Sequence, residues 1–265
     1  DILNAYYIGK PDSHLLTGKG LLIGVSHEIN QLNEEAQYGD LSAVLFQNTP
    51  VWVNWIRTPD LATALMNEWD AKIEAIAQQT IHDDVTSMSG VPTWTLVLLK
   101  RILEITGKQT IKEVWPNLEL YLHGGVSFTP YKEQFKQLIG SDISFLNVYN
   151  ASEGFFAAQT SFEDDGMLLF LDHGIFYEFM PIEEYGQPEP RTIGLNDVEI
   201  DKNYALVIST NGGLWRYLVG DTIAFTALHP FKIKVTGRLK HYINAFGEEI
   251  IVDNTDKAIA IASQK

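Results

Sequence analysis

The sequence predicts an α/β fold in which a sheet flanked by helices adjoins a β-rich, barrel-like subdomain. Two observations predict this class. Over about the first 150 residues, segments with helical periodicity alternate with short apolar runs of strand length, as in a sheet covered by helices. After Met167 the chain changes to short segments of alternating polarity separated by turn residues, which is typical of antiparallel strands.

Apolar spacing and the residues that begin or end helices locate the first elements. Residues 20–25 are predicted as a strand. Residues 61–79 have the periodicity of one amphipathic helix, which begins after Pro59-Asp60. Residues 95–106 form the next predicted helix, because Gly107 is a residue type that commonly ends helices.

Two predicted strands separated by a helix follow. Residues 118–123 form a strand that runs into Gly124-Gly125. A helix over 131–139 follows Thr129-Pro130, with proline in its favoured first turn, and residues 143–149 form the next strand. Ligands in such sheets bind outside the carboxyl ends of strands, so the ends of both strands are candidate ligand positions.

The second part of the chain is predicted as five strands and one exposed loop, Glu183 to Arg191. We expect the α/β subdomain over residues 1–166, the β-rich subdomain over 167–252 and the start of a linker or helix over 253–265. The five strands are predicted over 167–171, 175–180, 204–209, 222–227 and 231–236.

Composition excludes several classes of function. The net charge of −15 over 265 residues argues against nucleic-acid binding, because the phosphate backbone attracts basic surfaces. The absence of cysteine excludes disulfides and thiol nucleophiles and fits a cytoplasmic protein. No apolar run approaches the ~18 residues of a membrane span, so no membrane partner is expected. The histidines show no metal-ligand spacing, and His82-Asp83-Asp84 is predicted as a solvated loop or helix cap.

Three short segments indicate a nucleotide site. In Tyr149-Asn150-Ala151-Ser152-Glu153-Gly154, small residues let the backbone approach a ligand. Mg²⁺ usually binds only one or two protein carboxylates, so Glu153 alone is a sufficient protein ligand. Trp215 to Asp221 is predicted to end in a turn whose carboxylate accepts from two ribose hydroxyls. In Gly237-Arg238 the guanidinium suits phosphate or ribose oxygens.

Each of these residues has a plainer alternative. Asp221 is equally typical of a turn-stabilising aspartate, and Arg238 of a surface ion pair. Gly124-Gly125-Val126-Ser127 suits either a flat backbone wall for an adenine ring or a simple turn. Tyr149 either stacks on the base or fills the core.

The joint order of the three segments resembles the acyl-adenylate-forming superfamily and, within it, the Gretchen Hagen acyl-acid amido synthetases, with a likeness to bacterial-type members. Further motifs along nearly the whole chain carry the same resemblance. They are Trp115-Pro116-Asn117 before a predicted strand, His123-Gly124-Gly125 after it, the Tyr-x-x-Ser-Glu form that ends at Glu153, and Gly237-Arg238 extended to Asn244-Ala245-Phe246-Gly247-Glu248-Glu249.

The resemblance implies ATP-dependent activation of a small carboxylic acid as its adenylate, followed by conjugation to an amino acid. It implies ATP and Mg²⁺, with Glu153 as metal ligand, Glu153 and Arg238 as catalytic residues and Phe155 as a contact to the acid. Nucleotide contacts are implied for Gly124, Gly125, Val126, Ser127, Tyr149, Asn150, Ala151, Ser152, Asp221 and Arg238.

The family also has an N-terminal phosphate loop and a C-terminal domain with a reactive lysine, neither of which has a match here. The resemblance therefore implies a fragment that is inactive alone, with residues 253–265 leading toward the C-terminal domain. Two alternatives stay open, an acyl-CoA ligase and a non-catalytic nucleotide-binding fragment. The identity of the acid and the oligomeric state stay open as well.

Overall fold

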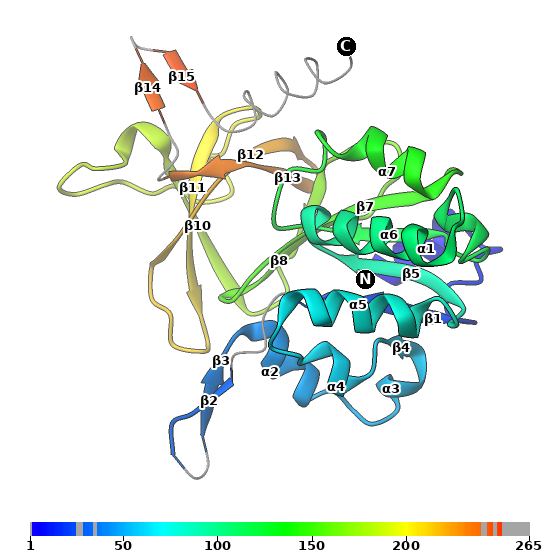
Figure 1. Ribbon diagram of the computed structural model, residues 1–265. Coiled ribbons are helices and arrows are strands. Elements are labelled where there is room, and N and C mark those ends of the chain that lie inside the picture. Colours follow the sequence, from blue (N-terminus) through cyan, green and yellow to red (C-terminus); the bar gives the residue numbers. More distant parts are fainter. Residues whose placement is uncertain (1, 25–28, 34–35, 240–242, 246–247, 251–265) are drawn as a thin grey trace. The chain divides into compact units, whose positions relative to one another are not determined.

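The computed structural model describes residues 2–24, 29–33, 36–239, 243–245 and 248–250 (Figure 1). The chain divides into two compact units, which we call the α/β unit, Lys10–Leu146, and the β-rich unit, Asp1–Gly9 together with Asn147–Lys265. The change of polarity pattern in the sequence predicts a boundary at 166/167. The observed division falls earlier because the strands on both sides of Glu153 pair antiparallel within the β-rich unit. The predicted linker over 253–265 lies outside the described residues.

The α/β unit contains short strands and most of the helices of the described chain. Its strands are β1 (Lys19–Leu22), β2 (Ile29–Gln31), β3 (Gln37–Gly39), β4 (Arg57–Thr58), β5 (Val85–Gly90), β6 (Leu120–His123) and the first residues of β7 (Ser144–Ala151). Its helices are α2 (Leu41–Gln47), α3 (Val53–Ile56), α4 (Leu61–Ala64), α5 (Trp69–Thr80), α6 (Pro92–Thr106), the 3₁₀ turn η1 (Ile111–Glu113) and α7 (Lys132–Ile139).

The main sheet of the α/β unit is parallel. Strands β4, β1, β5 and β6 lie in that order, and all three ladders between them are parallel. Helices α5 and α6 pack side by side against these strands (Figure 1). At the carboxyl ends of β5 and β6, Gly90 pairs with His123, so the chain leaves the sheet there toward Gly124.

The predicted helix over 61–79 is wrong as a single element, because the structure has α4 and α5 in its place. Asp60 begins α4 by accepting a hydrogen bond from the Thr63 backbone N–H at 2.8 Å. Glu68 begins α5 in the same way, with its carboxylate accepting from the backbone of Asp70 and Ala71. The apolar period runs through both helices, which is why it hid the break between them.

The ends of α6 and α7 follow proline and glycine chemistry. Helix α6 begins at Pro92, three residues before the predicted start, and ends at Gly107, whose φ of 65° is the left-handed form that glycine favours. Helix α7 begins at Lys132, so Pro130 lies outside the helix rather than in its first turn as predicted.

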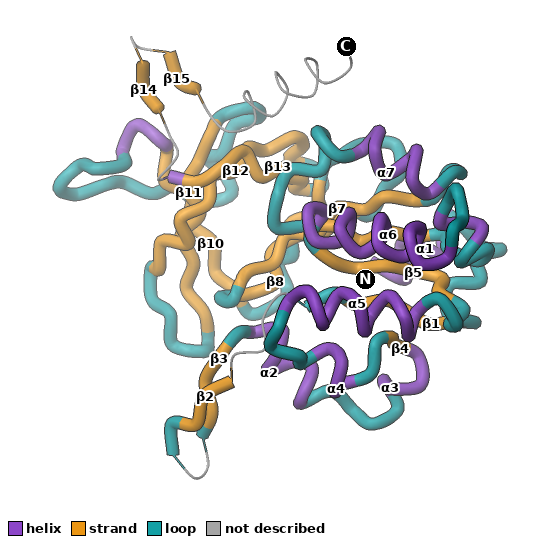
Figure 2. Tube along the Cα trace, viewed as in Figure 1, coloured by secondary structure: helices purple, strands orange, loops and turns teal. Residues whose placement is uncertain are grey.

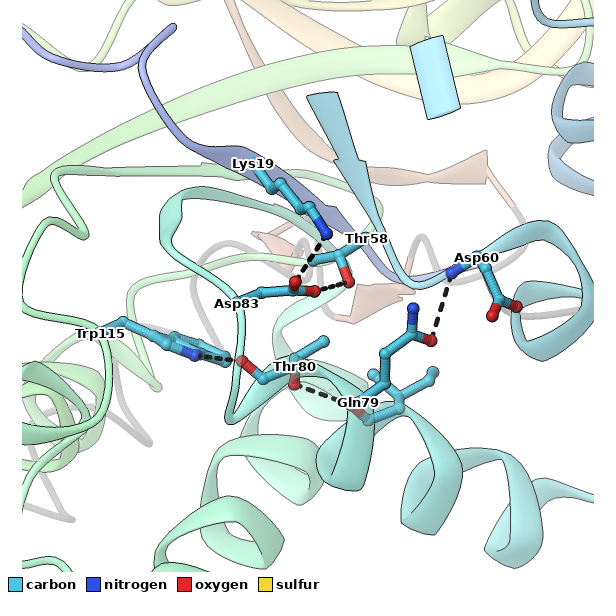
Figure 3. Close-up of polar contacts among 8 residues, drawn as sticks. Lys19, Thr58, Asp60, Gln79, Thr80, Asp83 and Trp115 are labelled. Carbon is cyan, nitrogen blue, oxygen red and sulfur yellow. Dashed lines mark hydrogen bonds and ion pairs between the residues drawn. The ribbon is translucent and has the colours of Figure 1, made fainter. Parts of the chain in front are cut away.

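A buried tryptophan ties the α/β unit together. Trp115 is fully buried, and its indole N–H donates to the Thr80 carbonyl at 2.8 Å (Figure 3). Nearby, Asp83 accepts from Lys19 and from the Thr58 hydroxyl, both at 2.6 Å. Asp83, which was predicted with its neighbours as a solvated loop or helix cap, joins β1 and β4 through these two contacts.

Lys72 on α5 is a buried amine with no hydrogen-bond partner among the residues that the structure describes. Burial lowers the pKa of Lys72, although the nearby charge of Asp40 opposes the shift. A buried, unsatisfied polar group costs about 1–3 kcal/mol. We therefore expect Lys72→Met to raise the thermal midpoint of the protein by a few degrees at pH 7.

The pH dependence gives this prediction a second readout. Between the lowered pKa of Lys72 and its ordinary value of 10.5, the unfolded state binds more protons than the folded state, so this residue makes stability rise with pH there. Lys72→Met should remove that rise, whereas Lys100→Met, on the exposed surface of α6, should leave it unchanged. A lower thermal midpoint for Lys72→Met would show that the amine is satisfied in solution.

The β-rich unit is built mainly from strands, which are orange in Figure 2. The ladders that join them are antiparallel. From β7 the strand order runs β7, β8, β9, β13, β12, β11, β10. The elements are α1 (Ile2–Gly9), β8 (Gly154–Gln159), β9 (Met167–Leu169), β10 (Ile175–Pro181), the 3₁₀ turn η2 (Ile182–Glu184), β11 (Asn203–Thr210), β12 (Tyr217–Leu228), β13 (Phe231–Arg238) and the separate hairpin β14 (Ile243–Ala245) and β15 (Glu248–Ile250).

One hydrophobic core is shared by strands that are far apart in this order. Tyr149 on β7 and Phe156 on β8 belong to the same buried cluster as Tyr177 on β10 and Phe225 on β12. Strands this far apart in one sheet share a core only if the sheet curls around that core. The predicted barrel-like form therefore corresponds to a strongly curved sheet. The α/β class with a β-rich second unit is confirmed.

Candidate functional site

The predicted Ser-Glu loop is the tight turn of a β-hairpin. Strands β7 and β8 pair antiparallel up to Ala151 and Gly154, so Ser152 and Glu153 alone form the connection. Ser152 is exposed and Glu153 half-buried, as is Ala151, whereas Asn150 is exposed. A two-residue turn on paired strands holds its side chains in a defined position. Glu153 therefore lies at a fixed hairpin tip rather than on a loose loop.

Asp221 lies within a strand, which corrects the predicted turn. Strand β12 begins at Tyr217, and Asp221 pairs in register with Arg238 of β13. The Gly-Asp signal that suggested a turn marks a β-bulge, where β12 shifts register against β11 and Gly220 has a φ of 91°. The bulge, rather than a turn, sets the direction of the Asp221 side chain.

Both oxygens of the Asp221 carboxylate have partners. The Tyr149 hydroxyl donates to Oδ2 at 2.9 Å, and the Arg238 Nε lies 3.2 Å from Oδ1. Burial raises the pKa of Asp221, and the charge of Glu153 raises it further, while the bonds from Tyr149 and Arg238 lower it. Asp221 is 7% exposed. This cluster of Tyr149, Asp221 and Arg238 is called the carboxylate cluster below.

Arg238 and Tyr149 differ in how much surface they leave for a ligand. The Arg238 side chain is 69% exposed, so its guanidinium holds Asp221 through one nitrogen and leaves its other donors open to solvent. Tyr149 is 6% exposed, and its ring packs against Phe156 with centroids 5.0 Å apart. The structure therefore places Tyr149 in the core, one of the two positions that the sequence left open.

Glu153 is linked to β12 through Tyr217, a residue to which the sequence analysis assigned no role. Interaction with the Glu153 carboxylate, through hydrogen bonding and through its negative charge, raises the pKa of Tyr217. The influence of Glu153 on the pKa of Asp221 shows that the two carboxylates lie close enough to interact. The only feature of the sequence that could have pointed to Tyr217 is its position four residues before Asp221, within the segment Trp215 to Asp221.

An open hollow of about 480 Å³ lies beside the Glu153 turn. Phe155 lines it and stacks on Phe170 with centroids 5.6 Å apart, and Phe170 in turn packs against His173. Apart from Glu153 and Phe155, the lining residues are Gly154, His173, Gly174, Ile175, Thr210, Asn211 and Gly212. Turn residues at 173–174 and 210–212 were not predicted as site residues, since nothing in the sequence relates them to Glu153.

Gly124 to Ser127 belong to the α/β unit, where they follow the carboxyl end of β6. Gly125 has a φ of 80°, which a side chain would strain, and it is exposed together with Val126 and Ser127. His123, just before them, is buried against Phe128 with ring centroids 4.1 Å apart. Burial lowers the pKa of His123 to about 3, so this histidine stays neutral behind an exposed stretch of backbone.

Within the described ranges, no group of three His, Asp or Glu side chains is arranged to hold a metal ion. A Mg²⁺ ion needs less than that, because one or two carboxylates and the phosphates of a nucleotide complete its coordination. Glu153, half-buried at a hairpin tip, fits that donor set. None of the helices that the structure describes is long and apolar enough to cross a membrane.

Comparisons with known proteins agree with this geometry. The GH3 family N-terminal domain matches residues 13–143, and the GH3 family central domain matches residues 168–238. Indole-3-acetic acid-amido synthetase GH3.3 from Arabidopsis thaliana is 26% identical over 239 residues, which is 83% of this chain and 37% of that protein. Jasmonoyl-L-amino acid synthetase JAR4 from Nicotiana attenuata is 30% identical over 126 residues, 45% of this chain and 22% of that protein.

Solved structures share the fold at lower sequence identity. GH3.15 acyl acid amido synthetase superposes with a TM-score of 0.75 at 15% identity over 97% of this chain and 55% of that chain. A 2-hydroxyisobutyryl-CoA ligase in complex with 2-HIB-AMP gives a TM-score of 0.59 at 13% identity, over 92% of this chain and 48% of that chain. The chain thus spans about half, or less, of the proteins that it matches. With both of its family domains matched in order, the chain belongs to the GH3 family.

Proposed function

We propose that the protein containing this chain is an ATP-dependent ligase that activates a small carboxylic acid as its adenylate and transfers the acyl group to an amino acid. The observation that carries the proposal is the pair of unlike carboxylates in the β-rich unit. Asp221 is buried and held by two partners, whereas Glu153 stands at a hairpin tip. GH3 family membership and the names of the amido synthetase relatives support the same reaction.

In this proposal Glu153 is the protein ligand of Mg²⁺. A bound Mg²⁺ supplies charge neutralisation on the phosphates. The chain's own contribution is to present one carboxylate from a two-residue hairpin turn. The first half-reaction needs little acid-base chemistry, because the acid's carboxylate attacks the α-phosphate and pyrophosphate leaves. Positioning and charge stabilisation are the main demands.

Nucleotide recognition is divided by chemistry. Asp221 accepts from the two ribose hydroxyls, and the open donors of Arg238 bind phosphate or ribose oxygens. For the α/β unit taken by itself, the exposed backbone at Gly124 to Ser127 is the stretch proposed to contact an adenine ring. Asn150, Ala151 and Ser152 supply backbone or short side chains near the nucleotide. None of these contacts requires a basic surface, in keeping with a net charge of −15.

The hollow beside Glu153 is proposed to take the organic acid. Its lining combines an aromatic wall, Phe155 on Phe170, with a few polar groups, the composition typical of small-molecule sites. The hollow borders the metal carboxylate, which is where the reacting carboxyl group must lie. The chemical class of acid that fits an aromatic wall of this kind is flat and largely apolar.

Pyrophosphate release by the complete protein tests the reaction. We expect release that requires ATP, Mg²⁺ and a suitable acid, and an amide product when an amino acid is added. A thioester formed from CoA instead of an amide would assign the acyl-CoA ligase alternative. Absence of pyrophosphate with every acid, in a protein that binds AMP, would assign a non-catalytic nucleotide-binding protein.

Phe155→Ala should raise the KM for the acid about tenfold and leave the KM for ATP near its original value. An aromatic contact with the substrate is worth on the order of 1.4 kcal/mol, which corresponds to a factor of ten. Initial rates at varied acid and varied ATP check this result. Phe176→Ala is the matched control, because Phe176 is 67% exposed on β10 and does not line the hollow. An equal increase in both KM values would remove Phe155 from the acid site.

A further inference from the structure

The carboxylate cluster contains a contact that backbone pairing does not explain. Tyr149 lies on β7 and Asp221 on β12, and three strands, β13, β9 and β8, separate these two in the sheet order. Their side chains nevertheless meet across the interior of the curled sheet, with the phenol oxygen 2.9 Å from Oδ2. Arg238 reaches the other oxygen from the neighbouring strand β13.

We propose that Tyr149 is a positioning residue that orients the Asp221 carboxylate for a ribose diol, rather than a stacking partner for the base. The inference rests on the proposed function, because it takes Asp221 as the ribose ligand. The inference gives Tyr149 an indirect role in recognition of the ribose.

Counting acceptor sites supports this assignment. A carboxylate offers about four lone-pair sites, two on each oxygen. Among the residues that the structure describes, Tyr149 occupies one site on Oδ2 and Arg238 one on Oδ1, which leaves one site on each oxygen for a ligand. Two free sites on adjacent oxygens are what the 2′- and 3′-hydroxyls of a ribose require. The two protein partners leave the carboxylate neither saturated nor free to rotate.

The burial of Asp221 points in the same direction. A buried carboxylate is costly, and a well-packed apolar residue generally serves stability as well or better. Asp221 is nevertheless only 7% exposed, and the Tyr149 phenol and the Arg238 guanidinium both contact its carboxylate. This arrangement is expected of a residue kept for binding rather than for stability. Burial, followed by the adjacent Asp221 charge, raises the pKa of Tyr149, so its hydroxyl stays protonated and always donates.

The contact also predicts what happens without the phenol. In Tyr149→Phe the ring still fills the core against Phe156, but Oδ2 loses its donor. Asp221 is then free to turn both oxygens toward Arg238, whose guanidinium can bind a carboxylate through two nitrogens. Its free acceptor sites would no longer face the ribose.

The test measures binding of AMP, 2′-deoxy-AMP and 3′-deoxy-AMP to the complete protein by calorimetry. Each hydrogen bond between a hydroxyl and a carboxylate is worth about 10- to 100-fold in affinity, so the unmodified protein should prefer AMP over either deoxynucleotide by that factor. Tyr149→Phe should lower AMP affinity by the factor of both hydrogen bonds and the affinity of each deoxynucleotide by the factor of the one bond that it retains, so that all three nucleotides bind with similar affinity. The ratio of AMP to deoxy-AMP affinity therefore falls toward one.

Tyr177→Phe is the matched control. Tyr177 is buried in the same core, and its hydroxyl has no hydrogen-bond partner among the described residues. This variant should keep the full preference for ribose. This control separates the effect of removing any buried tyrosine hydroxyl from the effect of removing the hydroxyl that donates to Asp221.

The outcomes separate the inference from the function on which it rests. If the unmodified protein binds none of the three nucleotides, the proposed function fails. If it binds AMP and the deoxynucleotides equally, Asp221 is not the ribose ligand. If it prefers ribose and Tyr149→Phe keeps that preference, Tyr149 does not position Asp221 and the inference is overturned. An equal loss for all three nucleotides would show a merely structural role and overturn it as well.

Discussion

Replacing Glu153 by alanine should abolish Mg²⁺-dependent pyrophosphate release and leave the fold intact. The variant lacks the carboxylate that we propose to hold Mg²⁺, and removal of one such charge-stabilising group costs at least ~100-fold in rate. The fold should persist because Glu153 lies in a two-residue hairpin turn rather than in the core. Pyrophosphate release at varied Mg²⁺ concentration, together with the thermal midpoint, checks both parts.

Glu163→Ala is the control for the change of charge at position 153. Glu163 is an exposed glutamate of the same unit and lies outside the hollow. Its removal should leave both rate and Mg²⁺ dependence unchanged. Pyrophosphate release by Glu153→Ala at the rate of the unmodified protein would take the metal role away from Glu153.

Asp221→Ala should weaken ATP and AMP by the same factor, about 10²- to 10⁴-fold, because both nucleotides carry the ribose that two hydrogen bonds recognise. Glu153→Ala should instead weaken ATP more than AMP, because a Mg²⁺ ion held by Glu153 would neutralise phosphate charge that AMP lacks. Calorimetric affinities of the two nucleotides for the two variants check this contrast.

The contrast needs its own control, because Asp221→Ala also removes a partner of Tyr149 and Arg238. Asp197→Ala, at an exposed aspartate of the same unit, removes a charge without touching the carboxylate cluster and should alter neither affinity. If both Asp221→Ala and Glu153→Ala weaken the two nucleotides equally, the two carboxylates do not have the separate roles proposed here.

The sequence was sufficient where local chemistry fixes the structure. Gly107 ended α6 as predicted, because a left-handed residue at a helix end strongly favours glycine. Asp60 began α4 as predicted, because its side chain satisfies a backbone N–H. Signals of this kind act over a few residues and can be interpreted from the sequence alone.

The predictions were incomplete where distant residues decide the structure. The Gly220-Asp221 signal suggested a turn, but pairing of Asp221 with Arg238 extends a strand through it. The core position of Tyr149 and its bond to Asp221, 72 residues away along the chain, depend on the curl of the sheet. The hollow escaped prediction for the same reason, since its lining comes from three separate turns.

The carboxylate cluster has a consequence for how this family varies. Tyr149, Asp221 and Arg238 come from three strands, yet each oxygen of Asp221 depends on one of the other two residues. A change at any one of them leaves a buried group unsatisfied, so the three positions should evolve together and substitutions at 149 and 238 should accompany substitutions at 221.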